Sequence, residues 1–269
     1  MSRTASRWTE PNLPSALDRC RVRLGQGIHC TIAFLGGSAQ TDEQASQAVK
    51  FFLDSIKMLN EENLDASITV KPTTLGVLLD KARCTEHILA IFREALAHNV
   101  GFEMATEGKD LVQYTVETAV RCAKERHNVT LALQAYLDRT VEDLKIALNN
   151  GIRPRLVKGA YLGDTGDYVE IQGRFKTLAE IVLENMHPLL VGTHDPDLIR
   201  WAIQRVDSNR QLIEFGFLKG LADNTKVNLA RRGWSVSEYI PFGENVEAYE
   251  SRRWRYLREL ERFGRAPVP

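Results

Sequence analysis

Apolar and polar residues follow two alternating rhythms along this chain. Short runs rich in apolar and β-branched residues recur at intervals of roughly 20–40 residues. They lie at 29–35, 67–71, 100–104, 129–133, 155–158, 189–193, 212–215 and 237–241. We predict that each run is a strand, because such near-continuous hydrophobicity is typical of parallel strands buried on both faces.

The intervening segments have the periodicity of α-helices. In 42–62, 85–98, 110–126 and 141–150, apolar residues recur at three- and four-residue steps and so share one helix face. Strands that alternate with helices in this way over 269 residues predict an α/β fold, a single (β/α)8 TIM-like barrel. We expect residues 1–28 to form a short N-terminal helical arm and residues 29–269 to form the barrel.

A doubly wound open sheet is the alternative fold for alternating strands and helices. Such a sheet usually has a glycine-rich first turn. The chain contains neither G-x-G-x-x-G after a strand nor G-x-x-x-x-G-K-[ST]. We therefore favour the barrel.

Composition and charge exclude several classes of protein. The 35 Lys and Arg residues balance the 35 Asp and Glu residues, whereas domains that bind nucleic acid tend to be basic. The four cysteines are far apart and fit neither a disulfide framework nor a zinc site. The sequence shows no secretory signal and no apolar run of about 20 residues. We expect a cytoplasmic protein without a nucleic-acid partner, at most peripheral to the inner membrane.

Polar residues gather where the predicted strands end. In a (β/α)8 barrel, catalytic residues come from the carboxyl ends of the strands. The residues that this rule selects are Lys71, Gln134, Arg155, Lys158, Thr193, His194 and Tyr239. Solvated strand ends would also be polar, but Lys71, Arg155 and Lys158 stand inside or directly after apolar runs, which favours a functional site.

Two of these residues each have two interpretations. A buried lysine at a strand end can form a Schiff base, or Lys158 can anchor a phosphate or a flavin beside the two small residues that follow it. His194 can face a ligand, or it can simply precede a helix that begins at Asp195-Pro196. The residues alone leave both questions open.

The last predicted helix, 246–263, has an unusual polar face. Its members are spaced at i, i+3, i+4 and i+7 and are Tyr249, Arg252, Arg253 and Tyr256. Two adjacent arginines flanked by tyrosines suit the bidentate binding of a carboxylate. A solvated basic helix is the alternative, because further arginines and glutamates follow.

Taken together, the motifs along the chain resemble those of a known family. They are VKPTTLG (70–76), ALQAYL (132–137), RLVKGAY (155–161), GTHD (192–195), EFGFLKG (214–220), YIPFG (239–243) and YESRRW (249–254). In this order they resemble the proline dehydrogenase family, whose catalytic domain is a distorted (β/α)8 barrel that uses FAD. The resemblance covers about residues 29–263 and implies that the barrel is a catalytic domain.

The resemblance implies a role for each matching residue. Arg155 would lie near the N5 edge of FAD, and Gln134 would form a hydrogen bond with the isoalloxazine. The other cofactor contacts would be Val157, Lys158, Gly159, Ala160, Thr193 and His194. The substrate carboxylate would be bound by Lys71, Arg252 and Arg253. The walls around the substrate ring would be Tyr161, Leu218, Tyr239 and Tyr249.

Three departures from the family pattern change the expected site. Gly37 stands where the family has a glutamate that forms an ion-pair gate with one clamp arginine. Ala105 replaces the aspartate that partners the lysine, and Gly216 replaces a flavin-facing glutamine. We therefore expect a more cationic site, an altered gate and a lowered pKa for Lys71.

The implied reaction is the FAD-dependent oxidation of a cyclic secondary amino acid. For L-proline, a hydride would pass to flavin N5 and the product would be 1-pyrroline-5-carboxylate. The electrons would then leave to a quinone or to oxygen. Two alternatives stay open: a barrel enzyme with a repurposed substrate or Schiff-base lysine chemistry, and a non-catalytic homologue that binds a metabolite.

Overall fold

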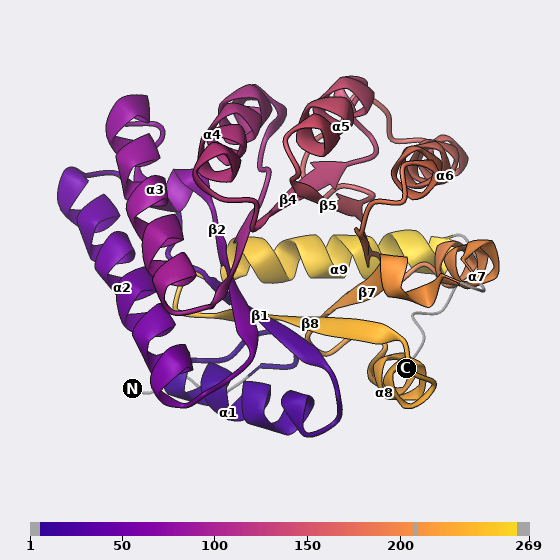
Figure 1. The fold of residues 1–269 in the computed structure, drawn as a ribbon, viewed down its shortest axis with the longest axis horizontal. Coiled ribbons are helices and arrows are strands. Elements are labelled where there is room, and N and C mark those ends of the chain that lie inside the picture. Colours follow the sequence, from indigo (N-terminus) through magenta and orange to yellow (C-terminus); the bar gives the residue numbers. More distant parts are fainter. Residues whose placement is uncertain (1–5, 207–208, 263–269) are drawn as a thin grey trace.

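A closed barrel of parallel strands forms the centre of the molecule (Figure 1). The computed structural model describes residues 6–206 and 209–262. The strands, each paired with its neighbours in sequence order, are β1 (His29–Phe34), β2 (Ala66–Val70), β3 (Gly101–Met104), β4 (Val129–Gln134), β5 (Arg153–Val157), β6 (Leu189–Gly192), β7 (Ile213–Leu218) and β8 (Ser235–Phe242). The pairing of β1 with β8 closes the barrel, which confirms the predicted (β/α)8 fold.

Helices precede, surround and follow the barrel strands. The α-helices are α1 (Leu13–Leu24), α2 (Asp42–Glu61), α3 (Lys81–Ala97), α4 (Val112–Glu125), α5 (Thr140–Asn149), α6 (Tyr168–Glu184), α7 (Pro196–Arg205), α8 (Asp223–Arg231) and α9 (Glu247–Arg262). Three short 3-10 helices are η1 (Pro72–Leu75), η2 (Lys109–Leu111) and η3 (Arg210–Leu212). None of the helices in the described ranges is both long and apolar enough to cross a membrane.

Several strands extend beyond the segments predicted for them, and β5 and β7 show why. β5 begins two residues early, because Arg153 and Pro154 do not belong to the apolar run but still pair with β4. β7 continues through Gly216 to Leu218. A glycine interrupts the hydrophobic pattern there, although its backbone stays in register with Ser237 of β8. Apolar runs alone therefore underestimate the length of strands whose inner faces are polar or lack a side chain.

Side chains inside the barrel alternate with those that face the surrounding helices. On β5, Arg155 lines an internal cavity, whereas its neighbour Leu156 is fully buried in the main hydrophobic core. Several buried polar residues share the interior with Arg155. They include Thr31, Thr69, Glu103 and Ser237. This polar interior adjoins the carboxyl ends of the strands, where the predicted site residues lie.

The N-terminal arm packs on the barrel through α1. The helix is capped by Asn12, whose side chain accepts a hydrogen bond from the Ser15 N–H. Arg19 and Arg23 both pair with the fully buried Glu238 of β8, at 2.7 Å each. Lys226 of α8 also pairs with Glu238, so three cations surround one carboxylate. The predicted arm is thus an integral part of the fold.

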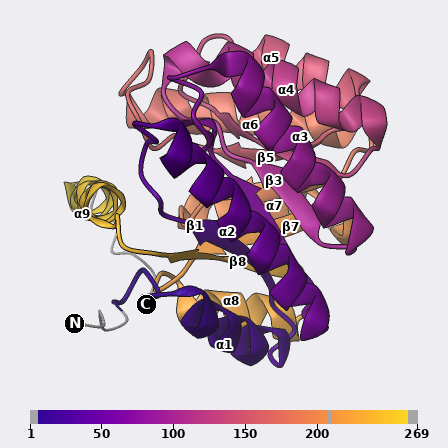
Figure 2. The same ribbon diagram turned by 90° about the vertical axis from the view of Figure 1, so that its left-hand side faces the viewer.

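Helix α9 differs from the other helices in its position. In Figure 1 it crosses the middle of the ring of helices, and in Figure 2 it is seen end-on at one side of the barrel. Its residues Tyr249 and Leu257 are buried together with Leu35 and Tyr239 from strand ends. The helix therefore covers the carboxyl-terminal mouth of the barrel.

Candidate active site

A cleft of about 160 Å³ lies between α9 and the carboxyl ends of β1 and β2. Four of the predicted substrate-binding residues line it, although they come from separate parts of the chain. They are Lys71, Tyr161, Tyr249 and Arg252. Gly37, where the family pattern has a glutamate, lines the same cleft beside Asn245. The structure therefore brings Lys71 and Arg252 to one place, whereas Arg253, Leu218 and Tyr239 do not line this cleft.

Lys71 follows β2 directly and precedes η1. No carboxylate among the described residues lies within ion-pair distance of its ammonium group. The pKa of Lys71 is lowered to about 8, mainly by burial and in addition by the positive charges of Arg252 and Arg253, while Glu107 opposes the change. The predicted lowering is confirmed, but desolvation is a larger cause than the neighbouring positive charges.

Glu107 fixes the backbone beside Lys71. Its carboxylate accepts hydrogen bonds from the Thr73 N–H (2.9 Å) and the Thr73 hydroxyl (2.7 Å). Its carbonyl oxygen accepts one from Gln134 Nε2 (3.0 Å). Glu107 thus links the end of β4 to the segment that follows β2. It orients this edge of the cleft rather than neutralising Lys71.

The polar face of α9 is directed at the site. The Arg252 guanidinium lies 5.0 Å from the centre of the Tyr161 ring, and that of Arg253 lies 5.1 Å from the Tyr249 ring. Burial raises the pKa of Tyr249, so its hydroxyl stays protonated. By contrast, Arg255 and Arg258 are exposed. The carboxylate-clamp interpretation is therefore favoured over a uniformly solvated basic helix.

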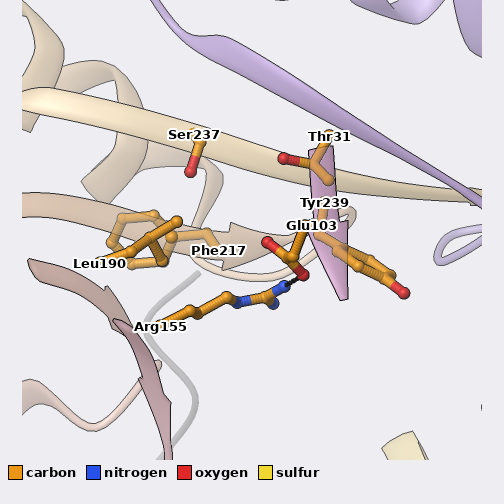
Figure 3. Close-up of a pocket in the computed structure, with 8 residues that line it drawn as sticks. Thr31, Glu103, Arg155, Leu190, Phe217, Ser237 and Tyr239 are labelled. Carbon is orange, nitrogen blue, oxygen red and sulfur yellow. Dashed lines mark hydrogen bonds and ion pairs between the residues drawn. The ribbon is translucent and has the colours of Figure 1, made fainter. Parts of the chain in front are cut away.

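Inside the barrel, Arg155 forms an ion pair with Glu103 beneath the mouth (Figure 3). The Arg155 guanidinium also lies 5.0 Å from the centre of the Tyr239 ring. Burial opposes the charge of Arg155, but Glu103 raises the pKa of the guanidinium. Glu103 was not among the predicted site residues. The signal was its position two residues before Ala105, because alternate residues of a strand share a face.

The predicted cofactor residues lie on adjacent strands on the other side of the mouth. Val157 at the end of β5 is in register with Gln134 of β4 and with Gly192 of β6. The side-chain oxygen of Gln134, Oε1, accepts a hydrogen bond from the Tyr136 hydroxyl (2.7 Å) and a longer one from the Ala160 N–H (3.5 Å). This arrangement holds Gln134 in one orientation at the rim.

Gly159 has a structural role that the sequence did not reveal. Its φ of +140° disfavours any residue with a side chain. A Cβ atom at this position would lie 1.4 Å from Cε1 of Tyr136. The Tyr136 hydroxyl in turn accepts a hydrogen bond from the Tyr161 N–H (2.8 Å). Gly159 therefore lets Tyr136 connect the segment after β5 to Gln134.

The structure also bears on the two interpretations of Lys158. Its ammonium group pairs with the Asp195 carboxylate and lies 3.9 Å from the centre of the Tyr168 ring. Asp195 accepts a further hydrogen bond from Gln172 Nε2 (2.6 Å). An ammonium held in an ion pair has no free lone pair for attack on a carbonyl. These contacts favour an anchoring role for Lys158 over Schiff-base chemistry.

The structure confirms that His194 precedes a helix, and its contact with a ligand stays a prediction. Asp195 is the N-cap of α7 and Pro196 is its first residue, as predicted. The His194 Nε2 atom accepts a hydrogen bond from the Leu218 N–H (2.9 Å), and burial lowers its pKa well below the usual value. Its ring is therefore neutral, with the proton on Nδ1. Thr193, also buried, accepts a hydrogen bond from the Asp195 N–H (3.2 Å).

Comparison with known proteins assigns the family. The family described as proline dehydrogenase matches residues 16–257. The chain belongs to this family. Proline dehydrogenase 1 of Bacillus subtilis subsp. natto is 28% identical over 234 residues, which are 84% of this chain and 78% of the relative. Proline dehydrogenase of Deinococcus radiodurans is 30% identical over 135 residues, 47% of this chain and 43% of the relative.

A solved structure shows the same fold. Proline utilization A from Bdellovibrio bacteriovorus, inactivated by N-propargylglycine, superposes with a TM-score of 0.82 at 19% sequence identity. The match covers 90% of this chain and 31% of that protein. This chain therefore corresponds to about a third of the larger protein. Its fold is that of a proline dehydrogenase barrel, an oxidoreductase scaffold.

Buried polar atoms provide a test of whether the family's cofactor and substrate fit this site. The buried polar atoms without a hydrogen-bond partner among the described residues include Arg155 Nε, Arg253 Nε and the Tyr249 hydroxyl. Buried polar groups in proteins are normally paired. Arg155 lies on the predicted flavin side of the mouth and the other two lie on α9. These donors therefore suit a polar cofactor next to an anionic substrate.

Proposed function

We propose that this protein oxidises a cyclic secondary amino acid, L-proline first, to its imine, 1-pyrroline-5-carboxylate, with FAD as the hydride acceptor. The observation that carries the proposal is the shared cleft of Lys71 and Arg252, whose two cations face one space walled by Tyr161 and Tyr249. Two cations beside aromatic rings suit an amino acid with an apolar ring and one carboxylate. Membership of the proline dehydrogenase family supports the same substrate.

The residues of this chain would bind and orient the substrate. Lys71 and the arginines of α9 would hold the carboxylate, and the ring would lie among Tyr161, Tyr239, Tyr249 and Leu218. Such fixation removes rotational freedom before the reaction, which is a large part of what an active site contributes. α9 covers the mouth and would exclude water.

The cofactor would be held by residues of β4, β5 and β6. Gln134 and Arg155 would contact its ring system, and the backbone from Val157 to Ala160 would lie alongside it. Lys158, Thr193 and His194 would face the remainder. When bound, FAD supplies the oxidising power by accepting a hydride at N5. Arg155 would contribute a positive charge beside the ring, moderated by its ion pair with Glu103.

A spectrum and an anaerobic titration test the proposal. The purified protein should show the visible absorbance of bound flavin, and L-proline should bleach it without oxygen. Parallel titrations with hydroxyproline and pipecolate show which other substrate rings the site binds and oxidises. Absence of flavin after FAD is added would overturn the proposal. Flavin that no cyclic amino acid bleaches would instead indicate a repurposed substrate.

The electron acceptor is proposed to be a quinone or oxygen. Protein reduced with L-proline should be reoxidised by one of the two, and stopped-flow mixing with a soluble quinone or with air-saturated buffer separates them. Faster reoxidation by the quinone would assign it as the partner. Reoxidation by neither would exclude both.

A further inference from the structure

The segment from Ser6 to Glu10, before α1, is bound to the mouth of the barrel. Glu10 pairs in parallel with Phe242 at the end of β8. The Glu10 N–H donates to the Pro241 carbonyl (2.8 Å), and the Gly243 N–H donates to the Glu10 carbonyl (3.2 Å). In Figure 2 this indigo segment lies on the same side of the barrel as α9. We call residues 6–10 the strap.

Lys219 anchors the strap from within. Its side chain is buried, and its ammonium group donates to the carbonyl oxygens of Ser6 (2.6 Å) and Thr9 (3.2 Å). The Glu10 carboxylate lies 3.2 Å from the same ammonium. A buried ammonium group needs several partners, and here the strap supplies them. Arg7 Nε strengthens the contact by donating to the Gly220 carbonyl (2.9 Å).

The anchor directly adjoins the proposed substrate walls. Lys219 follows Leu218 in sequence, and its backbone N–H donates to the Tyr239 carbonyl (2.9 Å). Any displacement of Lys219 would therefore also displace the two wall residues, Leu218 and Tyr239. The strap is held at the edge of the site, not at a distant surface.

Trp8 connects the strap to α9. It is only 4% exposed, and its ring meets the ring of Trp254 edge-on, with centres 4.7 Å apart and planes at 81°. Trp254 follows Arg253 immediately in α9. Trp8 also belongs to the buried cluster that contains Tyr239, Tyr249 and Leu257. The strap thus contacts the helix next to its proposed carboxylate clamp.

Helix α9 has few other attachments. Among its described side chains, Tyr249 and Leu257 are the buried ones, whereas α3 buries six along a helix of similar length. Tertiary packing supplies most of the stability of helices in proteins. A sparsely buried helix therefore depends strongly on each of its contacts, and Trp8 provides one of them.

We propose that the strap fixes α9 over the mouth of the barrel and that Trp8 is a positioning residue for substrate binding. The second part rests on the proposed function, because it assumes that Arg252 and Arg253 bind the carboxylate. The strap acts through α9 and touches neither substrate nor cofactor. It should therefore affect substrate affinity more than the rate of the chemical step.

The kinetic test compares Trp8→Ala with a matched tryptophan. Trp8→Ala should raise the KM for L-proline on the order of tenfold with kcat changed by less than about twofold, because the clamp is misplaced. Trp8→Phe should restore most of the affinity. Trp234 is also 4% exposed and meets Phe215 edge-on at 5.4 Å, but it packs at the opposite end of β7 and β8. Trp234→Ala should lower thermal stability and leave KM unchanged.

Two kinetic outcomes would overturn the positioning role. One is an unchanged KM in Trp8→Ala. The other is an equal rise of KM in Trp8→Ala and Trp234→Ala, because a general loss of stability would then explain both.

Hydrogen exchange tests the strap without reference to catalysis. Backbone amides of α9 should exchange faster in Trp8→Ala and in Lys219→Met than in the unaltered protein, while α3 is unchanged. Trp234→Ala should leave α9 unaffected. Unchanged exchange of α9 in both Trp8→Ala and Lys219→Met would overturn the proposal. Faster exchange in a protein that does not oxidise proline would uphold the strap and reject the proposed function instead.

Discussion

Arg155 and Glu103 form an ion pair inside the barrel, from strands that flank β4 on either side. Glu103 precedes Ala105 by two residues and lies deeper in the barrel. At the position of Ala105 the family pattern has an aspartate. The acid expected at the mouth is missing, and an acid on the same strand face lies deeper. Its partner is Arg155, on the proposed flavin side, rather than Lys71.

Replacement of Glu103 should raise the reduction potential of bound FAD. In Glu103→Gln the charge of Arg155 is no longer balanced, and a positive charge near the ring favours the reduced, more anionic flavin. A tenfold change in the two-electron equilibrium corresponds to about 30 mV. A shift of this order is expected by anaerobic redox titration against a reference dye.

The control for Glu103→Gln is an ion pair formed by another residue of β5, the strand that carries Arg155. Arg153 pairs with Glu214 at 2.9 Å, two residues before Arg155 on the same face. Glu214→Gln should reduce stability but leave the potential unchanged. Equal shifts in both variants would contradict a local effect of Glu103.

Removal of the Arg252 guanidinium should weaken substrate binding. Arg252→Met should cost about 2 kcal/mol in transition-state binding, roughly thirtyfold in kcat/KM for L-proline, mainly through KM. The FAD content should not change. Arg255→Met removes an exposed arginine of the same helix and should have little effect. Similar losses in both variants would show that net charge, not the clamp, governs binding.

Binding of a simple carboxylate should depend on the charge of Lys71. Its pKa is about 8, below the ordinary 10.5, so the ammonium loses its proton as the pH rises through 8. Cyclopentanecarboxylate has no amine, and its Kd should rise several-fold from about pH 7 to about pH 9. Lys71→Arg should bind it with a nearly constant Kd over this range. A rise of equal size in the variant would assign the titration to another group.

The buried carboxylate of Glu238 should contribute strongly to stability. Glu238→Gln removes the buried carboxylate that Arg19, Arg23 and Lys226 share and leaves them only the half-exposed Asp223. It should lower the free energy of unfolding by about 3 kcal/mol in urea titrations. Glu86→Gln, at an exposed position of α3, should change it by less than about 0.5 kcal/mol.

Acid should remove the contribution of Glu238 in a defined range. Burial alone would raise its pKa, but Lys226, Arg19 and Arg23 lower it from 4.5 to about 2. Its stabilisation is therefore complete above pH 4.5 and disappears as the pH falls towards 2. The difference between the unaltered protein and Glu238→Gln should shrink over that range. A constant difference would contradict the lowered pKa.

The strands and the residues at their ends could be predicted because parallel buried strands have a simple hydrophobic pattern. Lys71 and Arg155 were found in this way, and the polar face of α9 was found from its helical spacing. The structure places Lys71 and Arg252 in one cleft and Arg155 in the cavity beneath the mouth. Tyr136 and Lys219 were not found. Their roles depend on contacts with Gly159 and with the strap, which are distant in sequence and leave no periodic signal.

The positions where charged residues of the family pattern are replaced show the same limit of prediction from the sequence. Replacement of the aspartate by Ala105 correctly predicted a lowered pKa for Lys71. It did not indicate Glu103, because a carboxylate within an apolar strand resembles an ordinary interruption of the run. Which cation such an acid neutralises depends on how the strands are brought together around the barrel.

The contact between Trp8 and Trp254 joins the beginning of the barrel to its last helix. During synthesis on the ribosome, the strap emerges before the barrel strands and α9 emerges after them. A nascent chain could close all eight strands and still lack the cover of its mouth. Substrate affinity would then appear only when α9 has left the exit tunnel and met the strap, so partly made chains would be folded but inert.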